Sequence, residues 1–403
     1  MRILSINSVY SFGSTGKIAT AIHKGLLERG FISSVAYGRG QVIYEPNLYR
    51  IGWAWEVNLH ALHTRIFGTV GHGSYFGTKK LLNYISKFKP DVIHLHNIHA
   101  YYINVYLLFD YIRRNDIPVV WTLHDDWPFT GRCAYFYECE KWKSGCGGCP
   151  KLSEYPKTIF IDRSAGEWKR KQKAFYTIPR LVLTPPSQWL ANDLQSSFLG
   201  NKQIKVVPNA IDTETIFYPR ERNILRRKLG ISSTQHVVLA VAPDFNNERK
   251  GGKYILELAK AVEIDNLKIL IVGWKGDNNN LPANVIAIPP TKNQNELAEY
   301  YSSADVFVIT SIAENFPTVV LESLACGTPV VGFKVGGIPE QIKEHCGIVV
   351  TPKDVGELRK GVLNVISNPS SFARECCRKT AVEDYSSSVM VERYVSIYRE
   401  LME

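Results

Sequence analysis

The chain has 403 residues and lacks any long hydrophobic run, although apolar residues make up 45% of it. No stretch approaches the roughly 20 uninterrupted apolar residues that a membrane-spanning helix needs. The N-terminus runs from Met1 directly into a strand-like segment, without the regions of a signal peptide. The sequence therefore argues against a membrane-spanning helix and predicts a cytoplasmic protein.

A phosphate-binding P-loop is also absent. The small-residue segment from Ser11 to Ile18 contains Gly13 and Gly16, but it has Ser11 where such a loop needs glycine and Ile18 where it needs Ser or Thr. This difference excludes a P-loop nucleotide hydrolase. The segment instead predicts a tight connection between the first strand and the first helix, where the backbone can approach a ligand closely.

The balance of charge is basic, with a formal net charge of +10. Such a charge suits nucleic acid, an anionic membrane surface or phosphorylated substrates. The sequence has no aromatic and basic module that would favour nucleic acid, so we expect no nucleic-acid partner. The basic segment from Trp168 to Lys173 fits contact with anionic phospholipid headgroups and a solvated helix face equally well.

The length exceeds that of one ordinary core and predicts two domains. Apolar strand-like runs alternate with helical segments, which predicts parallel sheets and an α/β fold. In the first half we expect strands at Arg2 to Ser8, Val35 to Gly38, Asp91 to His96, Val119 to His124, Arg180 to Thr184 and Lys205 to Asn209. In the second half we expect them at Val237 to Ala242, Lys268 to Val272, Val285 to Ile288, Val306 to Thr310 and Val330 to Phe333.

The domain boundary is expected near residue 208. The segment from Thr213 to Ser233 is polar and charged, which suits a connection between domains better than a core element. Near the C-terminus, the segment from Val389 to Leu401 has helical spacing of its apolar residues. We therefore expect a terminal helix there.

Four of the eight cysteines lie close together, at Cys133, Cys139, Cys146 and Cys149. A cytoplasmic chain keeps thiols reduced, and the final C-x-x-C favours a structural zinc site with four thiolate ligands. Disulfides and free thiols are the alternatives, because the other spacings differ from the usual pairs. A catalytic metal is not expected, since four thiolates would close its coordination sphere.

The most informative motif is AENFPTVVLESLACGTPVV, in which Glu314 and Glu322 stand eight residues apart. The pattern predicts a buried strand, a loop that contains Glu314, and a helix that begins near Pro317 and contains Glu322. A glycine and a proline then stop the helix before the next strand. Because ligands bind at the carboxyl ends of parallel strands and free N–H groups at a helix start favour anions, this motif predicts a ligand site.

The whole stretch resembles the E-x7-E signature of the retaining GT-B glycosyltransferases of family four, with the following G-T-P-V-V strand and the G-G-I-P-E loop at Gly336 to Glu340. The run DWPFTG after His124 resembles a subgroup that builds surface polysaccharides. The resemblance implies two Rossmann-like domains that face a central cleft. Its expected parts are an acceptor domain, 1–208, with a cysteine-rich insertion, 127–157; a donor domain, 209–385; and a helix, 386–403, that crosses back to the first domain.

The resemblance also implies roles for individual residues. Glu314 would bind the donor sugar and Glu322 the ribose hydroxyls, while His124 would contact the sugar and Lys250 the phosphates. The other residues expected to bind the donor are Gly13, Gly16, Arg249, Asn315, Phe316 and Thr318. The chain reads Ala242-Pro243-Asp244 where the family has a Gly-Arg pair, so Arg249 is the candidate substitute. His94, His96 and His99 could suggest a metal, but the resembled enzymes use this edge for packing and acceptor contacts.

The implied activity is that of a retaining hexosyltransferase, which moves a sugar from a UDP- or GDP-sugar to a hydroxyl of a glycan or lipid-diphosphate-linked acceptor. Capsular, exopolysaccharide or lipopolysaccharide assembly is the implied process. No Asp-x-Asp motif is present, in keeping with a family that needs no metal for catalysis. The alternatives are an epimerase or phosphorylase of the same fold, or a binding protein for nucleotide-sugars. Peripheral contact with the inner face of the plasma membrane would suit a lipid-linked acceptor.

Overall fold

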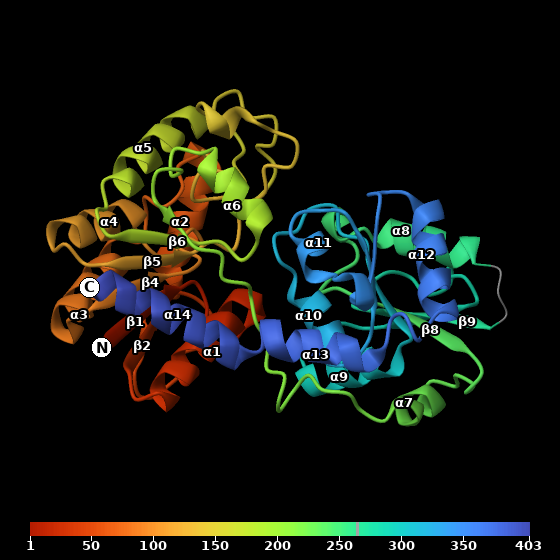
Figure 1. Cartoon of the computed structure of the whole chain (residues 1–403). Coiled ribbons are helices and arrows are strands. Elements are labelled where there is room, and N and C mark those ends of the chain that lie inside the picture. Colours follow the sequence, from red (N-terminus) through yellow and green to blue (C-terminus); the bar gives the residue numbers. More distant parts are fainter. Residues whose placement is uncertain (263–265) are drawn as a thin grey trace. The chain divides into compact units, whose positions relative to one another are not determined.

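The computed structural model describes residues 1–262 and 266–403. It divides the chain into two compact units (Figure 1). The first unit contains Met1–Pro208 and Met390–Glu403, and the second contains Asn209–Val389. Each is an α/β unit with one parallel sheet.

The first unit has a sheet of seven parallel strands in the order β3-β2-β1-β4-β5-β6-β7. The strands are β1 Arg2–Asn7, β2 Ile32–Tyr37, β3 Leu48–Arg50, β4 Val92–Leu95, β5 Val119–Thr122, β6 Leu181–Thr184 and β7 Gln203–Ile204. The helices are α1 Gly13–Glu28, α2 Ala54–Phe67, α3 Tyr75–Phe88, α4 Val105–Arg114, α5 Ser164–Tyr176, α6 Gln188–Gln195 and α14 Ser387–Met402, with a short 3-10 helix at Lys141–Lys143.

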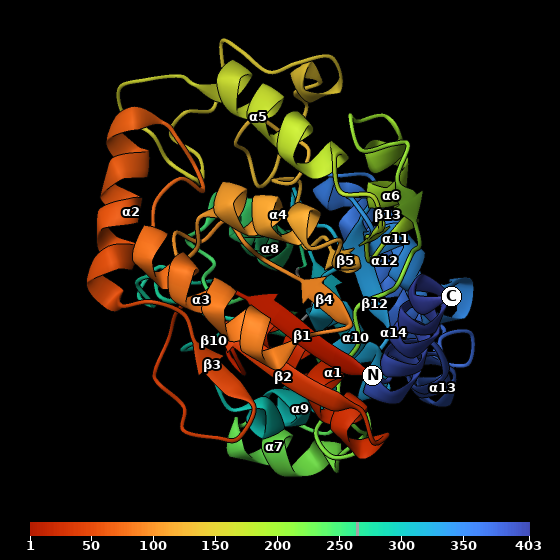
Figure 2. The same ribbon diagram turned by 90° about the vertical axis from the view of Figure 1, so that its left-hand side faces the viewer.

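Helices cover both faces of this sheet. On one face α3, α4 and α5 pack against Ile93, Leu95 and Trp121. On the other face α14 lies against β4 and β5, where the hydroxyl of Tyr398 hydrogen-bonds to His94 at 2.6 Å and that of Tyr394 to Thr122 at 2.6 Å (Figures 1 and 2). The last helix of the chain thus completes the core of the first unit.

The second unit has a sheet of six parallel strands in the order β10-β9-β8-β11-β12-β13. The strands are β8 His236–Val241, β9 Leu267–Val272, β10 Val285–Ile288, β11 Val306–Ile309, β12 Val330–Phe333 and β13 Gly347–Val350. The helices are α7 Arg222–Lys228, α8 Gly252–Ala261, α9 Gln294–Ser303, α10 Thr318–Ala325, α11 Ile338–Gln341, α12 Val355–Ser367 and α13 Arg374–Tyr385, with 3-10 helices at Glu248–Lys250 and Glu344–Cys346.

The central strands lie where the apolar runs predict them, but the prediction and the structure differ in three places. The predicted strand from Lys205 to Asn209 is absent, and the edge strand β7 lies just before it. The strands β3 and β13 were not predicted. The polar segment from Thr213 to Ser233 is part of the second unit, because it contains α7 and Phe217, which is fully buried.

Candidate functional site

Glu314 lies between two cations in the second unit. One oxygen of its carboxylate is 2.5 Å from the ammonium of Lys250 and 3.0 Å from a guanidinium nitrogen of Arg249. Arg249 also donates to the carbonyl of Ala313 at 2.7 Å. The three side chains come from the loop after β11 and from the 3-10 helix before α8, so parallel neighbouring strands deliver them to one edge of the sheet.

Gly251 allows these two segments to approach one another. Its φ of +69° lies in the left-handed region, and an added Cβ would stand 2.0 Å from the carbonyl oxygen of Thr310. The Thr310 hydroxyl donates to the carbonyl of Gly251 at 3.0 Å, and the N–H of Ile312 donates to the carbonyl of Arg249 at 2.9 Å. A side chain at position 251 would therefore push the cations away from Glu314.

The ionisation of Glu314 follows from this environment. Burial raises the pKa of its carboxyl, but the adjacent Lys250 and Arg249 lower the pKa by more than burial raises it. The pKa therefore lies below its ordinary value. The group is therefore a carboxylate at neutral pH. Together the carboxylate and the two cations carry one net positive charge, which favours an anionic ligand.

Glu322 lies inside α10, as the sequence pattern predicts, and the structure shows that it is mostly buried. Its carboxylate accepts a hydrogen bond of 3.0 Å from the hydroxyl of Tyr301. Pro317 is the residue before α10, not its first helical residue, and Thr318 begins the helix. The carbonyl of Phe316 accepts from the side chain of Asn209 at 2.9 Å, which fixes the entry to the helix.

Gly336 supports the loop that carries Glu314. Its φ is +53°, and an added Cβ would lie 1.7 Å from the carbonyl oxygen of Glu314. The N–H of Gly337 donates to the carbonyl of Asn315 at 2.9 Å. The G-G-I-P-E segment thus backs the Glu314 loop through direct backbone contact.

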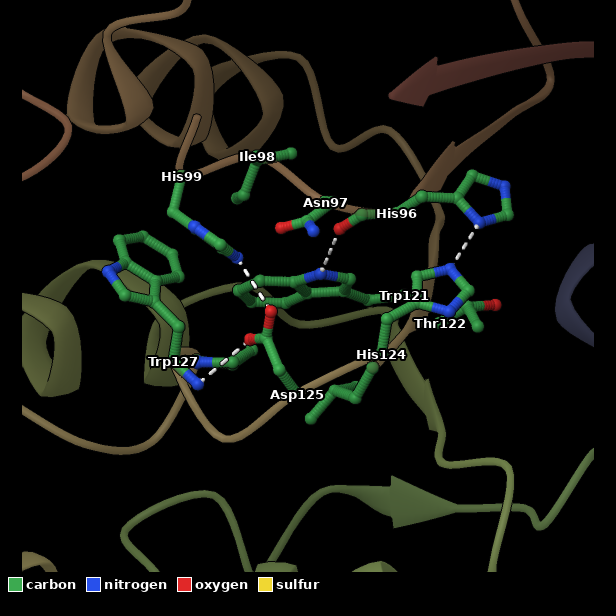
Figure 3. A pocket seen from close by; sticks show the side chains of 11 residues that line it. His96, Asn97, Ile98, His99, Trp121, Thr122, His124, Asp125 and Trp127 are labelled. Atoms are coloured by element: carbon green, nitrogen blue, oxygen red, sulfur yellow. Dashed lines mark hydrogen bonds and ion pairs between the residues drawn. The ribbon is translucent and has the colours of Figure 1, made fainter. Parts of the chain in front are cut away.

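In the first unit, His124 follows β5 and lines a small pocket with residues that follow β4 (Figure 3). Its Nε2 lies 3.2 Å from Nδ1 of His96, and the two rings stack with an angle of 17° between their planes. Burial lowers the pKa of His124 to about 4 and that of His96 well below its ordinary value. Both rings are therefore neutral at pH 7, and one ring donates a hydrogen bond to the other.

Beside them, Asp125 and His99 form a second buried pair in the same pocket, with a distance of 2.8 Å between Oδ2 and Nε2 (Figure 3). Burial raises the pKa of Asp125, but His99 and the N–H of Trp127 lower it below its ordinary value. Asp125 is thus the negative charge nearest to His124 in this pocket.

Gly13 and Gly16, which were expected in a loop before the first helix, lie inside that helix. Gly13 is the first residue of α1, and Gly16 lies within its first turn. An added Cβ on Gly16 would be 3.1 Å from Val9, so this glycine allows α1 to pack against the preceding loop. The part of the predicted loop from Gly13 onward is therefore helical.

The four clustered cysteines do not form a metal site in the structure. Cys133 and Cys149 share a hydrogen bond, which raises the pKa of the first thiol and lowers that of the second. Cys146 accepts from the N–H of Gly131 at 3.1 Å. Within residues 1–262 and 266–403, no group of three or more His, Cys, Asp or Glu side chains is placed to hold a metal ion. The predicted ligand set is therefore not assembled.

The basic segment from Trp168 to Lys173 is not a free aromatic face. Trp168 is buried, and its Nε1 donates to the carbonyl of Trp142 at 2.8 Å. Lys171 is fully buried and donates to the carbonyls of Trp127 and Thr130. The tryptophan of this segment therefore does not face the solvent, and only its remaining polar residues do.

Two family comparisons cover most of the chain. Residues 221–383 match the sequence model of the glycosyl transferases group 1, and residues 18–215 match that of glycosyltransferase family 4. The chain is a glycosyltransferase of these families. Its two parallel-sheet units are those of the GT-B fold, so the predicted family and fold are confirmed.

Relatives span the full length of this glycosyltransferase. It is 26% identical to the putative colanic acid biosynthesis glycosyl transferase WcaC of Escherichia coli over 100% of both chains. It is 24% identical to the N-acetyl-alpha-D-glucosaminyl L-malate synthase of Bacillus anthracis over 99% of this chain and 97% of the relative. Anabaena Alr3699/HepE, solved in complex with UDP, has the same fold with a TM-score of 0.68 at 14% identity, over 99% of this chain and 100% of that one.

Two neighbours of the expected site residues were not assigned to the site in advance. Tyr301 lies on α9 and reaches Glu322 on α10, and no spacing in the sequence connects these two helices. His96 was considered only as a packing, acceptor or metal residue, whereas the structure makes it the partner of His124. Its position at the end of β4, beside the end of β5, was the available signal.

Proposed function

We propose that this glycosyltransferase is a retaining hexosyltransferase that uses a UDP- or GDP-sugar. The acceptor would be a hydroxyl of a glycan or of a lipid-diphosphate-linked sugar, and the process capsular, exopolysaccharide or lipopolysaccharide assembly. The relationship to WcaC supports this process, and the UDP complex of the structurally similar HepE supports a nucleotide-sugar donor.

The observation that carries the proposal is the placement of Glu314 between Lys250 and Arg249, next to the start of α10. Glycosyl transfer develops positive charge on the anomeric carbon and negative charge on the departing diphosphate. Lys250, Arg249 and the first N–H groups of α10 would stabilise the diphosphate. We assign Glu314 to the donor sugar and Glu322 to the ribose, with Asn315, Phe316 and Thr318 lining the donor.

Retention follows if the acceptor oxygen attacks the face from which the diphosphate leaves. The anomeric carbon–oxygen bond to the phosphate breaks, the bond to the acceptor oxygen forms, and the acceptor proton passes to the leaving phosphate. We assign His124 to a hydrogen bond with the donor sugar, for which its neutral state suits it. In this scheme the cations of Lys250 and Arg249 take the place of a divalent metal, and Gly13 and Gly16 line the diphosphate.

The first experiment is a thermal-shift screen of the wild-type protein and Glu322→Ala against UDP, GDP, ADP, TDP and their sugars. A ligand that binds the folded state raises the apparent stability. We expect UDP or GDP to raise the melting temperature of the wild type, and Glu322→Ala to reduce that shift. No shift with any nucleotide would contradict the donor site.

Stereochemistry and metal dependence need separate measurements. NMR of the product formed from an α-linked donor should show an α-linkage, and an inverted product would contradict retention. Transfer should persist in EDTA, because the proposed chemistry uses no metal. The structural zinc predicted at the four clustered cysteines has its own test, metal analysis of the purified protein. About one zinc per chain would support it, and a metal-free protein would contradict it.

Contact with a membrane belongs to the same proposal, since a lipid-diphosphate acceptor lies at the bilayer surface. The net charge of +10 supports contact with an anionic surface. Within the described residues, none of the helices combines the length and the apolar character needed to span a bilayer.

A further inference from the structure

An ordinary surface helix buries its apolar face, but α2 in the first unit buries a largely polar face and exposes an apolar one. Its inward residues include Glu56, His60 and Thr64, all of them buried. Its outward residues include Trp55, Leu59 and Leu62, which are 52%, 56% and 52% exposed. Because these three are spaced by four and three residues, they form one apolar stripe along the helix.

Hydrogen bonds hold the polar face of α2 in place. The carboxylate of Glu56 accepts from the N–H groups of Phe76 and Gly77 at 2.8 and 3.0 Å, at the start of α3. His60 accepts from the N–H of Gly73 at 3.1 Å, and the hydroxyl of Thr64 donates to the carbonyl of Thr69 at 2.8 Å. Because its buried polar groups have these partners, the helix can keep its apolar stripe on the outside.

Other exposed apolar residues extend the stripe at both ends. At one end the ring of Trp53 stacks near that of Trp55, with 6.1 Å between centroids. At the other end the N–H of Ile159 donates to the carbonyl of Arg65 at 2.8 Å, which fixes the neighbouring loop against α2. We call this surface the α2 patch; its exposed apolar members are Trp53, Trp55, Leu59, Leu62, Phe67, Tyr75, Phe76, Ile159, Phe160 and Ile161.

Along α2 and α3, which carry most of the α2 patch, the exposed charges are of one sign. Between Trp53 and Pro90 the only acidic residue is Glu56, and its side chain is buried. Five Lys or Arg residues lie in the same stretch. Two of them stand over exposed rings, Lys80 at 4.4 Å from the centroid of Trp53 and Lys79 at 5.5 Å from that of Tyr75.

We propose that the α2 patch docks the protein onto an anionic lipid bilayer. Tryptophan and phenylalanine suit the boundary between headgroups and acyl chains, while lysine can bury its apolar stem and reach anionic headgroups. Figure 2 shows α2 at the outer edge of the first unit. Trp55, Leu59 and Leu62 would enter the interface, and Lys79 and Lys80 would pair with phosphates.

This surface differs from the basic face of α5, where Trp168 is buried. The α2 patch rests on the membrane contact proposed above and names its surface, but docking itself requires no sugar donor and no turnover. A failure of the α2 patch and a failure of the proposed transferase activity are therefore separate outcomes.

The test is flotation of the full chain with vesicles of phosphatidylcholine alone or with about one third phosphatidylglycerol. We expect binding only to the anionic vesicles. Leu59→Gln/Leu62→Gln and Lys79→Gln/Lys80→Gln should each weaken binding about tenfold or more, through lost apolar burial and lost charge respectively. The matched control Lys169→Gln/Lys173→Gln, on the exposed side of α5, should bind as the wild type does.

Circular dichroism and the nucleotide thermal shift verify that each variant is folded. Absence of binding to anionic vesicles would overturn the proposal. The proposal would also be overturned if Leu59→Gln/Leu62→Gln bound the vesicles as well as the wild type does, or if only the α5 control lost binding. If light scattering without lipid shows a dimer that Leu59→Gln/Leu62→Gln converts to a monomer, the α2 patch joins two copies of the chain and the bilayer proposal is wrong.

Discussion

At the scale of single residues, we expect both the stability of the second unit and the transfer activity to depend on the carboxylate of Glu314. In Glu314→Gln the side chain keeps its size but loses its charge, which leaves Lys250 and Arg249 without their anion. We expect the free energy of unfolding to fall by about 3 kcal/mol and kcat/KM to fall by about 100-fold. Urea unfolding and a steady-state transfer assay measure these effects.

The pH dependence of stability tests the contribution of Glu314 in a second way. The folded-state pKa of Glu314 is below its ordinary value, so its stabilising contribution is complete above about pH 4.3 and is lost as the pH falls through the folded-state pKa. The stability difference between the wild type and Glu314→Gln should therefore shrink at low pH. The control Glu383→Gln, on an exposed side chain of α13, should show no difference at either pH.

At the scale of single elements, the loop at Gly336 fixes the position of the Glu314 loop. Gly336→Ala adds a Cβ that would collide with the carbonyl of Glu314 and strains a residue with positive φ. We expect weaker nucleotide binding and a loss of about 2 kcal/mol in stability. The control Gly166→Ala in α5 has nothing within 4 Å of its Cβ, and it should be neutral or slightly stabilising.

The helix α14 offers another test at this scale. The Tyr398 hydroxyl is the hydrogen-bond partner of Nδ1 of His94, and both groups are buried. Tyr398→Phe should lower the free energy of unfolding by about 1 to 3 kcal/mol, because it leaves a buried nitrogen without that partner. Chemical denaturation checks this. Tyr44→Phe removes a hydroxyl from a highly exposed side chain and should change nothing.

At the scale of the whole molecule, acid should affect the two units differently. Six histidines of the first unit have pKa values lowered by burial: His23, His60, His63, His94, His96 and His124. Below about pH 6.5 these histidines bind protons in the unfolded chain but not in the folded protein. The free energy of unfolding therefore falls as the pH falls towards 4. Only two of the ten histidines lie in the second unit.

Tryptophan fluorescence can follow this loss, because seven of the eight tryptophans lie in the first unit. We expect the fluorescence-detected melting temperature to fall clearly between pH 7.5 and pH 5. His94→Gln should show a smaller fall than the wild type, since one titrating ring is removed. An equal fall in both proteins would contradict a contribution from His94.

Much of the architecture could be predicted from the sequence because the central strands are continuous apolar runs. The edge strand β3 was missed and β7 was misplaced because each is only two or three residues long and has little apolar signal. The edge strand β13, GIVV, has an apolar run that the sequence prediction overlooked. The Glu314 loop and the α10 helix were predictable from local pattern. The contact of Glu314 with Lys250 joins residues 64 positions apart and needed the tertiary structure. The burial of Trp168 could not be predicted, because the composition of a segment does not say which of its side chains face the core.

The position of α14 has a consequence for the order in which the protein is made. The ribosome completes Met1–Pro208 long before it adds Tyr394 and Tyr398, which cover β4 and β5 on one face of the first sheet. Asn209–Val389 is a continuous segment and can fold as soon as it emerges. The unit whose synthesis begins first is therefore the last to be finished, and a nascent chain leaves β4 and β5 without the cover of α14 until that helix has been synthesised.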